Sequence, residues 1–175
     1  YPDPTTAAQA QGIAEKYRLR LSAEAQARLA EETPKELTNA RSVVTGSVRQ
    51  LCTAAAGAAS ELGYTPIVLS TSLCCEAREA GSFLASIAQY HRDTETSLAF
   101  ILGGETVVHL TGDGLGGRNQ ELALGAARGI AGMQDTLIFS VGSDGTDGPT
   151  DAAGGWVDGE TLSRLTQAGL RVEDV

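Results

Sequence analysis

Aromatic residues, basic residues and long apolar runs are all scarce in this sequence of 175 residues. Phe, Trp and Tyr make up 5% of it, so a surface that stacks nucleic-acid bases is not expected. Lys and Arg number 13 against 22 Asp and Glu, and this net charge of -9 argues against binding of nucleic acid, whose phosphates require cations. The longest apolar run, residues 98–102, is far shorter than the roughly 20 residues that span a bilayer, so no membrane partner is expected.

Cysteine and histidine are equally sparse, and neither forms a metal or disulfide pattern. The three cysteines are Cys52, Cys74 and Cys75, an odd number without a CxxC pair, and the chain has two His. A disulfide framework or a zinc site with four ligands is therefore not expected. The simplest interpretation is three reduced thiols packed as small apolar side chains in a cytoplasmic protein. The chain starts Tyr-Pro-Asp-Pro, with neither an initiator Met nor a signal peptide, so we expect a piece of a longer protein.

The hydrophobic pattern predicts an α/β fold, and its first half divides into two segments. Residues 1–41 predict two helices, capped by Thr5 or Thr6 and by Ser22, followed by a polar linker. Residues 42–95 predict a strand at Val43 and Val44, a helix over 48–62, a strand over 66–70 and a helix over 76–90. This alternation is typical of a βαβ segment and indicates parallel strands.

The third segment, residues 96–175, predicts more strands than helices. Its expected elements are strands over 98–102 and 106–110, a helix over 119–130, a strand over 136–141, a loop over 142–158 and a helix over 159–168. The first two strands flank Gly103-Gly104, which predicts a hairpin. So long a loop inside a compact domain is usually functional or disordered. The expected fold class is thus α/β: a mixed sheet with βαβ units and Gly-rich strand-to-helix loops.

The Gly-rich loop, residues 112–117, precedes Arg118 at the start of a predicted helix. Glycine lets the backbone approach a ligand closely, and the unpaired N–H groups of a helix start favour an anion. Arg118 can add a bidentate contact to a carboxylate or a phosphate. The loop lacks the Gly-Lys-Ser/Thr ending of a Walker A motif, and its GxGxxG spacing alone is weak evidence for a dinucleotide. The pattern predicts an anion site, the alternative being a tight strand-to-helix turn with a surface Arg.

The Asp-rich loop, residues 142–151, follows a predicted buried strand and contains Asp144, Asp147 and Asp151. In open α/β sheets, ligands bind outside the carboxyl ends of the strands. Carboxylates there can hold Mg²⁺ or accept a hydroxyl proton, although their spacing is not that of an EF-hand. The alternative is a solvated loop of Asx-turns. Glu105, after Gly103-Gly104, either lines the same cleft or faces solvent on a hairpin.

Three segments in this part of the chain carry a family resemblance. They are residues 103–106 (Gly-Gly-Glu-Thr), 116–121 (Gly-Gly-Arg-Asn-Gln-Glu) and 144–154 (Asp-Gly-Thr-Asp-Gly-Pro-Thr-Asp-Ala-Ala-Gly). In order and spacing they resemble the C-terminal MOFRL domain of the glycerate 2-kinases, a family long described as hydroxypyruvate reductases. Weaker similarity reaches upstream to residues 43–47 and 76–79. The family's N-terminal domain, with its catalytic Lys, and its closing Thr-Gly-Pro-Thr-Gly-Thr-Asn segment have no counterpart in the sequence, so we expect a fragment of a two-domain enzyme.

The resemblance implies ATP-dependent phosphorylation of D-glycerate at its 2-hydroxyl, with ATP and Mg²⁺ as cofactors and a site in an interdomain cleft. The catalytic candidates are Arg118, which would clamp the substrate carboxylate or the γ-phosphate, and Asp144 and Asp147, which are also candidate Mg²⁺ ligands. The candidates for substrate and phosphate binding are Gly116, Gly117, Asn119, Gln120, Glu105 and Asp151. The expected partner is the small-molecule substrate, and a homodimer is left open.

Two other functions remain open on the sequence alone. An NAD(P)H-dependent hydroxypyruvate reductase would agree with the family's older description, but no dinucleotide βαβ unit with an acidic residue about twenty positions on is visible. A catalytically silent anion-binding fragment is the second alternative, because the family's Lys is missing.

Overall fold

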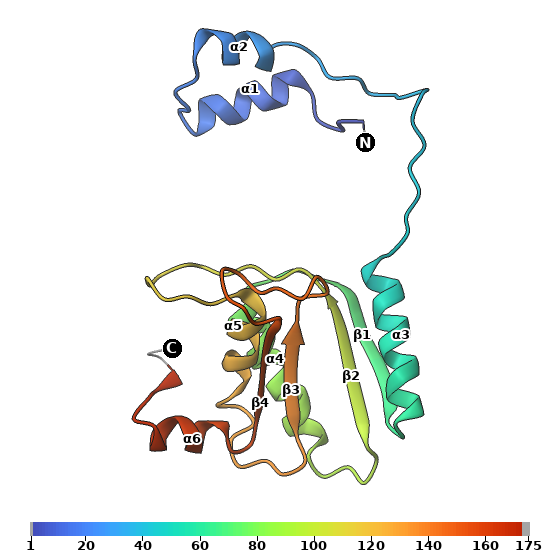
Figure 1. Ribbon diagram of the computed structural model, residues 1–175, viewed down its shortest axis with the longest axis vertical. Coiled ribbons are helices and arrows are strands. Elements are labelled where there is room, and N and C mark those ends of the chain that lie inside the picture. Colours follow the sequence, from blue (N-terminus) through green and yellow to red (C-terminus); the bar gives the residue numbers. More distant parts are fainter. Residues whose placement is uncertain (1, 173–175) are drawn as a thin grey trace. The chain divides into compact units, whose positions relative to one another are not determined.

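A computed structural model describes residues 2–172 of the chain and divides it into two compact units, residues 1–45 and 46–175 (Figure 1). The first unit contains two short helices, α1 (Ala7–Lys16) and α2 (Ala23–Leu29). Thr6 and Ser22 cap them through their side-chain oxygens, as predicted, and Thr6 forms a capping box with Gln9. Neither helix has a buried residue, so residues 2–45 form no buried apolar core of their own.

The second unit alternates helices and strands, which confirms the predicted α/β class. Its elements are α3 (Val48–Glu61), β1 (Thr65–Leu73), α4 (Ala77–His91), β2 (Leu98–Gly104), α5 (Arg118–Ala126), β3 (Leu137–Val141), β4 (Gly154–Asp158) and α6 (Thr161–Gln167). β1 and β2 pair in parallel around the crossover helix α4, and this is the βαβ unit of the chain. β3 and β4 pair antiparallel in a separate two-stranded sheet. β1 and β2, which lie on either side of the expected domain boundary near residue 95, thus belong to one sheet. The domain boundary itself stays a prediction.

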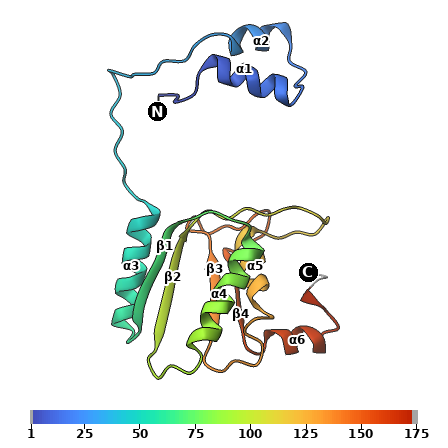
Figure 2. The same cartoon turned by 180° about the vertical axis from the view of Figure 1, so that it is seen from behind.

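Helices α3 and α4 cover opposite faces of the β1–β2 sheet. On β2, the Phe100 ring lies 4.9 Å from the His91 ring of α4, whereas a Cβ at Gly103 would meet Val48 and Cys52 of α3. Residues three apart on a strand point to opposite faces, so the two helices sandwich this sheet. α5 packs against β3 and β4, and α4 and α5 lie on the same side of the strands, nearest the viewer in Figure 2.

Two of the predicted strands are wrong. Val43 and Val44 are 67% and 68% exposed and belong to no strand, because no neighbouring strand bonds to so short a segment. Residues 106–110 do not fold back on β2 as a hairpin. Val107 instead donates its N–H to the Cys75 carbonyl (3.0 Å) and accepts from the Ala77 N–H (2.9 Å), in a single parallel bridge with Glu76. The expected loop over 142–158 is shorter, since its last residues form β4.

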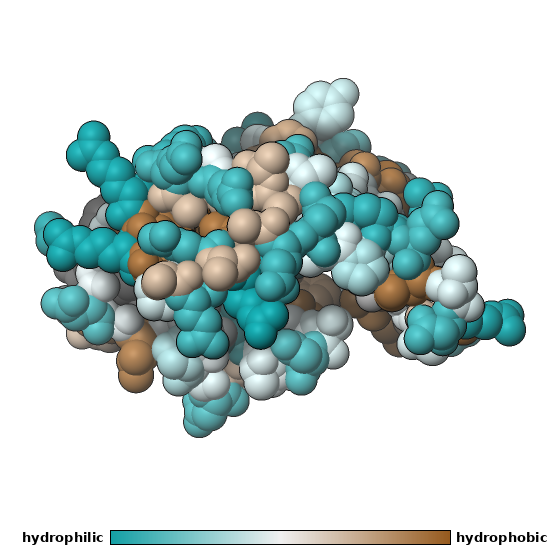
Figure 3. Space-filling view, turned by 90° about the horizontal axis from the view of Figure 1, so that it is seen from above, coloured by the Kyte–Doolittle hydropathy of each residue, from teal (hydrophilic) through white to brown (hydrophobic). Residues whose placement is uncertain are grey.

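Apolar side chains remain on the surface of the described chain. Figure 3 shows hydrophobic atoms, in brown and tan, between hydrophilic side chains on the face it presents. Among the described residues, no helix has the length and apolar character needed to cross a bilayer.

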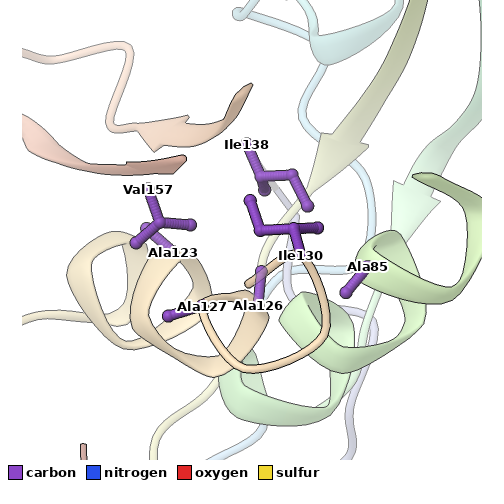
Figure 4. Close-up of a cluster of buried hydrophobic side chains, with 7 residues drawn as sticks. All are labelled: Ala85, Ala123, Ala126, Ala127, Ile130, Ile138 and Val157. Atoms are coloured by element: carbon purple, nitrogen blue, oxygen red, sulfur yellow. The ribbon is translucent and has the colours of Figure 1, made fainter. Parts of the chain in front are cut away.

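The core of the second unit lies between α4, α5 and the β3–β4 sheet (Figure 4). It is built from small side chains around Ile130, which is fully buried. The cluster consists of Ala85, Ala123, Ala126, Ala127, Ile130, Ile138 and Val157. The two helices approach so closely that a Cβ at Gly81 of α4 would overlap the Leu122 carbonyl of α5. This tight crossing fixes the start of α5, where the candidate site lies.

Candidate functional site at the start of α5

The start of α5 holds an anion, and that anion is the carboxylate of Asp147. Its two oxygens accept hydrogen bonds from the backbone N–H groups of Asn119 (3.0 Å) and Gln120 (2.8 Å). They also accept from the side-chain amides of the same two residues, at 2.9 and 3.1 Å. The side chain is buried, with Asp147 only 2% exposed. A carboxylate from the Asp-rich loop therefore satisfies N–H groups that would otherwise be unpaired at the helix start.

This carboxylate is the centre of a larger polar network. The Asn119 amide oxygen accepts a hydrogen bond of 2.6 Å from Ser140 of β3. The Gln120 amide donates to the Thr150 hydroxyl (3.0 Å), which in turn donates to the Asp147 carbonyl (2.7 Å). The network thus joins α5, β3 and the Asp-rich loop through side chains whose hydrogen-bonding groups are matched.

The glycines around the network allow the loop to approach the helix. A Cβ at Gly117 would overlap the carboxylate of Asp147, so any side chain there would displace it. Gly148 has φ +60, in the left-handed region that favours glycine, and its Cβ would overlap the Gly116 carbonyl. These glycines bring two parts of the protein together, which is a sufficient physical reason for their presence.

The charge of Asp147 is stabilised by its surroundings. Burial raises the pKa of the Asp147 carboxyl, but the hydrogen bonds from Asn119 and Gln120 lower it by more, so the pKa lies below its ordinary value. The group is therefore ionised at neutral pH. Its negative charge compensates the positive end of the α5 dipole.

Arg118 lies at the first position of α5. Its guanidinium is 48% exposed and forms an ion pair with Glu105, with Nη1 3.3 Å from Oε1. Glu105 is 74% exposed and lies directly after β2. Two of the predicted site residues, distant in sequence, are thus brought together at the surface. The ion pair is exposed, so its contribution to stability is small.

The other two Asp residues of the Asp-rich loop are on the surface. Asp144 is exposed, and its Oδ1 accepts a hydrogen bond from the Thr146 N–H (3.2 Å), an Asx-turn. Asp151 is exposed as well. Among the described residues, no group of three or more His, Cys, Asp or Glu is arranged to hold a metal ion. A site formed with the phosphates of a nucleotide needs only one or two carboxylates, and Asp144 fits that requirement.

The structure gives three of the predicted residues an intramolecular role, and their roles toward a ligand stay predictions. Asp147 does not fit the role of Mg²⁺ ligand or hydroxyl contact, because both its oxygens are engaged by protein donors and it is buried. Asn119 and Gln120 do not fit phosphate binding, because their backbone and side-chain N–H groups hold that same carboxylate. The start of α5 thus binds a carboxylate of the protein itself, and the binding of an anionic ligand at this place stays a prediction.

Sequence reasoning missed Ser140 and Thr150, which complete the network. Ser140 was detectable as the one polar side chain in the apolar strand Leu-Ile-Phe-Ser-Val. Thr150 gave no such signal, because Ser and Thr are common in any surface loop.

The fold and the site together describe an α/β protein in which a Gly-rich loop and an Asp-rich loop meet at the start of one helix, α5. Residues 98–175 match the MOFRL family, and this part of the chain belongs to that family. The chain is 46% identical over 173 residues to the D-glycerate 2-kinase of Thermotoga maritima, an alignment that covers 97% of this chain and 42% of the relative. It is 36% identical to a putative hydroxypyruvate reductase of Agrobacterium vitis, over 96% of this chain and 40% of that protein.

A solved structure agrees with these relatives. The crystal structure of the glycerate kinase from Thermotoga maritima superposes on the chain with a TM-score of 0.81 and 44% sequence identity. The match covers 99% of this chain and 43% of the other. The chain therefore spans less than half the length of the relatives it matches.

Proposed function

We propose that this chain supplies one wall of a site for ATP-dependent phosphorylation of D-glycerate at its 2-hydroxyl, with Arg118 as the residue that binds the anionic ligand. The proposal is carried by the 46% identity to D-glycerate 2-kinase over 97% of the chain. Because the chain corresponds to 42% of that relative, the activity is proposed for a polypeptide of the relatives' full length, and this chain alone is expected to be silent.

Two features of the site support Arg118 in this role. Asp147 already compensates the start of α5, so attraction of an incoming anion depends on the Arg118 guanidinium rather than on the helix. Glu105 places a carboxylate against that guanidinium, and a carboxylate is also the group that D-glycerate carries, which supports the proposed contact. In the proposed complex the substrate carboxylate or a phosphate oxygen replaces Glu105.

Asp144 is the proposed Mg²⁺ ligand, because its carboxylate is exposed in the loop that follows β3. When bound with ATP, Mg²⁺ supplies neutralisation of the phosphate charge. Gly116 lies beside the Asp-rich loop, and Asp151 contributes negative charge at its surface. Phosphoryl transfer asks mainly for positioning and electrostatic stabilisation, and these residues can provide both.

The test is a kinase assay on a polypeptide of the relatives' full length, which follows ADP release with D-glycerate and ATP. We expect Arg118→Ala to lower kcat/KM about 100-fold or more, since a charge-assisted contact to the ligand is lost. Arg118→Lys should fall in between, because Lys keeps the charge and loses the fork. Arg49→Ala, an exposed position in α3, is the matched control and should stay within a few-fold of the unsubstituted protein. Activity of Arg118→Ala within a few-fold of normal would exclude the proposed role.

A hydroxypyruvate reductase is the second candidate, favoured only by the name of the Agrobacterium relative. The geometry does not support it. In a dinucleotide fingerprint the strand runs directly into the glycines, whereas β2 ends at Gly104 and the Gly-rich loop begins at Gly112. The helix start that would receive the pyrophosphate holds Asp147 instead. Consumption of NADH with hydroxypyruvate, without ADP release with glycerate, would reverse this preference.

A further inference from the structure

β2 and β3 each have one edge without a hydrogen-bonded strand among the described residues. β2 bonds only to β1, and β3 bonds only to β4. In both views of the fold the strands follow the order β1, β2, β3, β4, so the two unpaired edges face one another (Figures 1 and 2). An unpaired strand edge presents a row of free N–H and C=O groups, which a further strand can pair with.

The register of β3 and β4 identifies the backbone groups on the open edge. Gly142 donates its N–H to the Ala153 carbonyl (2.7 Å), at the end of the β3–β4 ladder. Residues of an antiparallel strand alternate between hydrogen-bonded and non-hydrogen-bonded positions, so Ser140 and Ile138 also turn toward β4. Phe139 and Val141 therefore turn their N–H and C=O groups toward β2.

The side chains at this place are apolar but poorly covered. β2 is apolar at each of residues 98–102, as in a strand buried on both faces inside a parallel sheet, yet none of these residues is fully buried. The outward side chains of the β3–β4 sheet are large and exposed. They are Leu137 (56%), Phe139 (62%), Val141 (58%) and Trp156 (59%). α3 packs against β1 and β2, and these four side chains stay more than half exposed.

We propose that an extended apolar segment from another part of the full-length polypeptide inserts between β2 and β3 and joins the two small sheets into one. Relatives of this chain are more than twice as long, so most of their sequence lies outside the aligned part and can supply the segment. A second copy of the chain is a poorer occupant. A strand inserted between two others needs both edges free, and every strand described in this chain already has one edge bonded.

The proposal is tested by amide hydrogen exchange at four neighbouring residues of β3, followed by NMR. Phe139 and Val141 report on the open edge, and Ile138 and Ser140 are the matched controls on the β4 side. In the 175-residue chain, the open-edge amides should exchange about 100-fold faster than the controls, because only the controls are hydrogen-bonded. In a polypeptide of the relatives' full length, the two pairs should exchange at rates within about 10-fold of each other.

Two results would overturn the proposal. One is a difference between the two pairs that persists in the full-length polypeptide, since the edge would then stay open. The other is protection of Phe139 and Val141 already in the 175-residue chain. Protection that grows with concentration would identify a second copy as the occupant, and protection independent of concentration would identify a segment of the chain itself, such as residues 42–45. The readout does not depend on enzymatic activity, so it is independent of the proposed function.

Discussion

The Gly-rich loop and the Asp-rich loop are both rich in glycine, but the first is exposed and the second is packed against its surroundings at Asp147 and Gly148. Residues 112–116 are all exposed, and a Cβ at Gly112, Gly114 or Gly116 would meet nothing within 4 Å. In the Asp-rich loop, Asp147 is buried and Gly148 touches the backbone of the other loop. The glycines at 112, 114 and 116 have open space around them, whereas Gly148 is needed for the close approach of two backbone segments. The difference shows that only one of the two loops is anchored by its own side chains.

The largest expected effect comes from removing that anchor. Asp147→Asn should lower the free energy of unfolding by about 2–4 kcal/mol, because the new amide places N–H donors against the N–H groups of Asn119 and Gln120. Asp144→Asn is the matched control, and at its exposed position the change should stay within about 0.5 kcal/mol. Urea unfolding of the 175-residue chain measures both. Equal effects of the two substitutions would mean that the anchor is not what holds the Asp-rich loop.

A smaller effect is expected from filling the space between the loops. Gly148→Ala combines a positive φ with an overlap on the Gly116 carbonyl, and should cost about 1–3 kcal/mol. Gly114→Ala in the Gly-rich loop is the control, where open space predicts a change within about 0.5 kcal/mol. Thermal unfolding of the two variants tests the contrast. A destabilising Gly114→Ala would show that the Gly-rich loop is packed after all.

The smallest expected effect is a loss of stability at acidic pH. The pKa of Asp147 is lowered, and the side-chain hydrogen bond from Arg164 lowers the pKa of Asp158 to about 2. A carboxyl with a depressed folded pKa stabilises the protein fully above its unfolded pKa, about 4, and loses this contribution as pH falls through the folded value. Stability should therefore decline between about pH 4 and pH 2. The decline should be shallower in Asp147→Asn and in Asp158→Asn, measured as the free energy of unfolding against pH, and an unchanged slope in both would contradict this origin.

Local rules predicted the parts of this fold that depend on neighbours in sequence. The caps Thr6 and Ser22, the helices over most of their length and the apolar strands β1 and β2 follow from residues within one or two turns of each other. β4 was missed because Gly154-Gly155 opens it, and glycine disfavours strands. The hairpin was wrong because alternation indicates a strand but does not select its partner. Residues 106–110 could bond to β2 or to the start of α4, and the structure has the second arrangement.

In the candidate site, too, local sequence patterns predicted some features, whereas others depend on residues distant in sequence. The Gly-rich loop and the helix start predicted a site for an anionic ligand at α5, and in the structure the side chain of Asp147 accepts the hydrogen bonds of that helix start. Whether that anion is a ligand or a side chain depends on Asp147, which lies 28 residues from Asn119 in sequence. The unpaired N–H groups are the same in both cases, so no local pattern distinguishes them. The roles of Arg118, Glu105 and Asp144 toward a substrate stay predictions.

The close crossing of α4 and α5 limits which amino-acid substitutions this protein can accept. A Cβ at Gly81 would overlap the Leu122 carbonyl, and a Cβ at Gly125 would lie 2.7 Å from the Arg78 carbonyl. Because no residue is smaller than glycine, neither position can be exchanged for another residue without moving a whole helix. A library that randomises every position should thus tolerate broad variety at residues 112–116 and almost none at residues 81 and 125. In a redesign of this surface, residues 112–115 of the Gly-rich loop are therefore the positions to vary, whereas the helical crossing and the anchored Asp147 and Gly148 are the positions to keep.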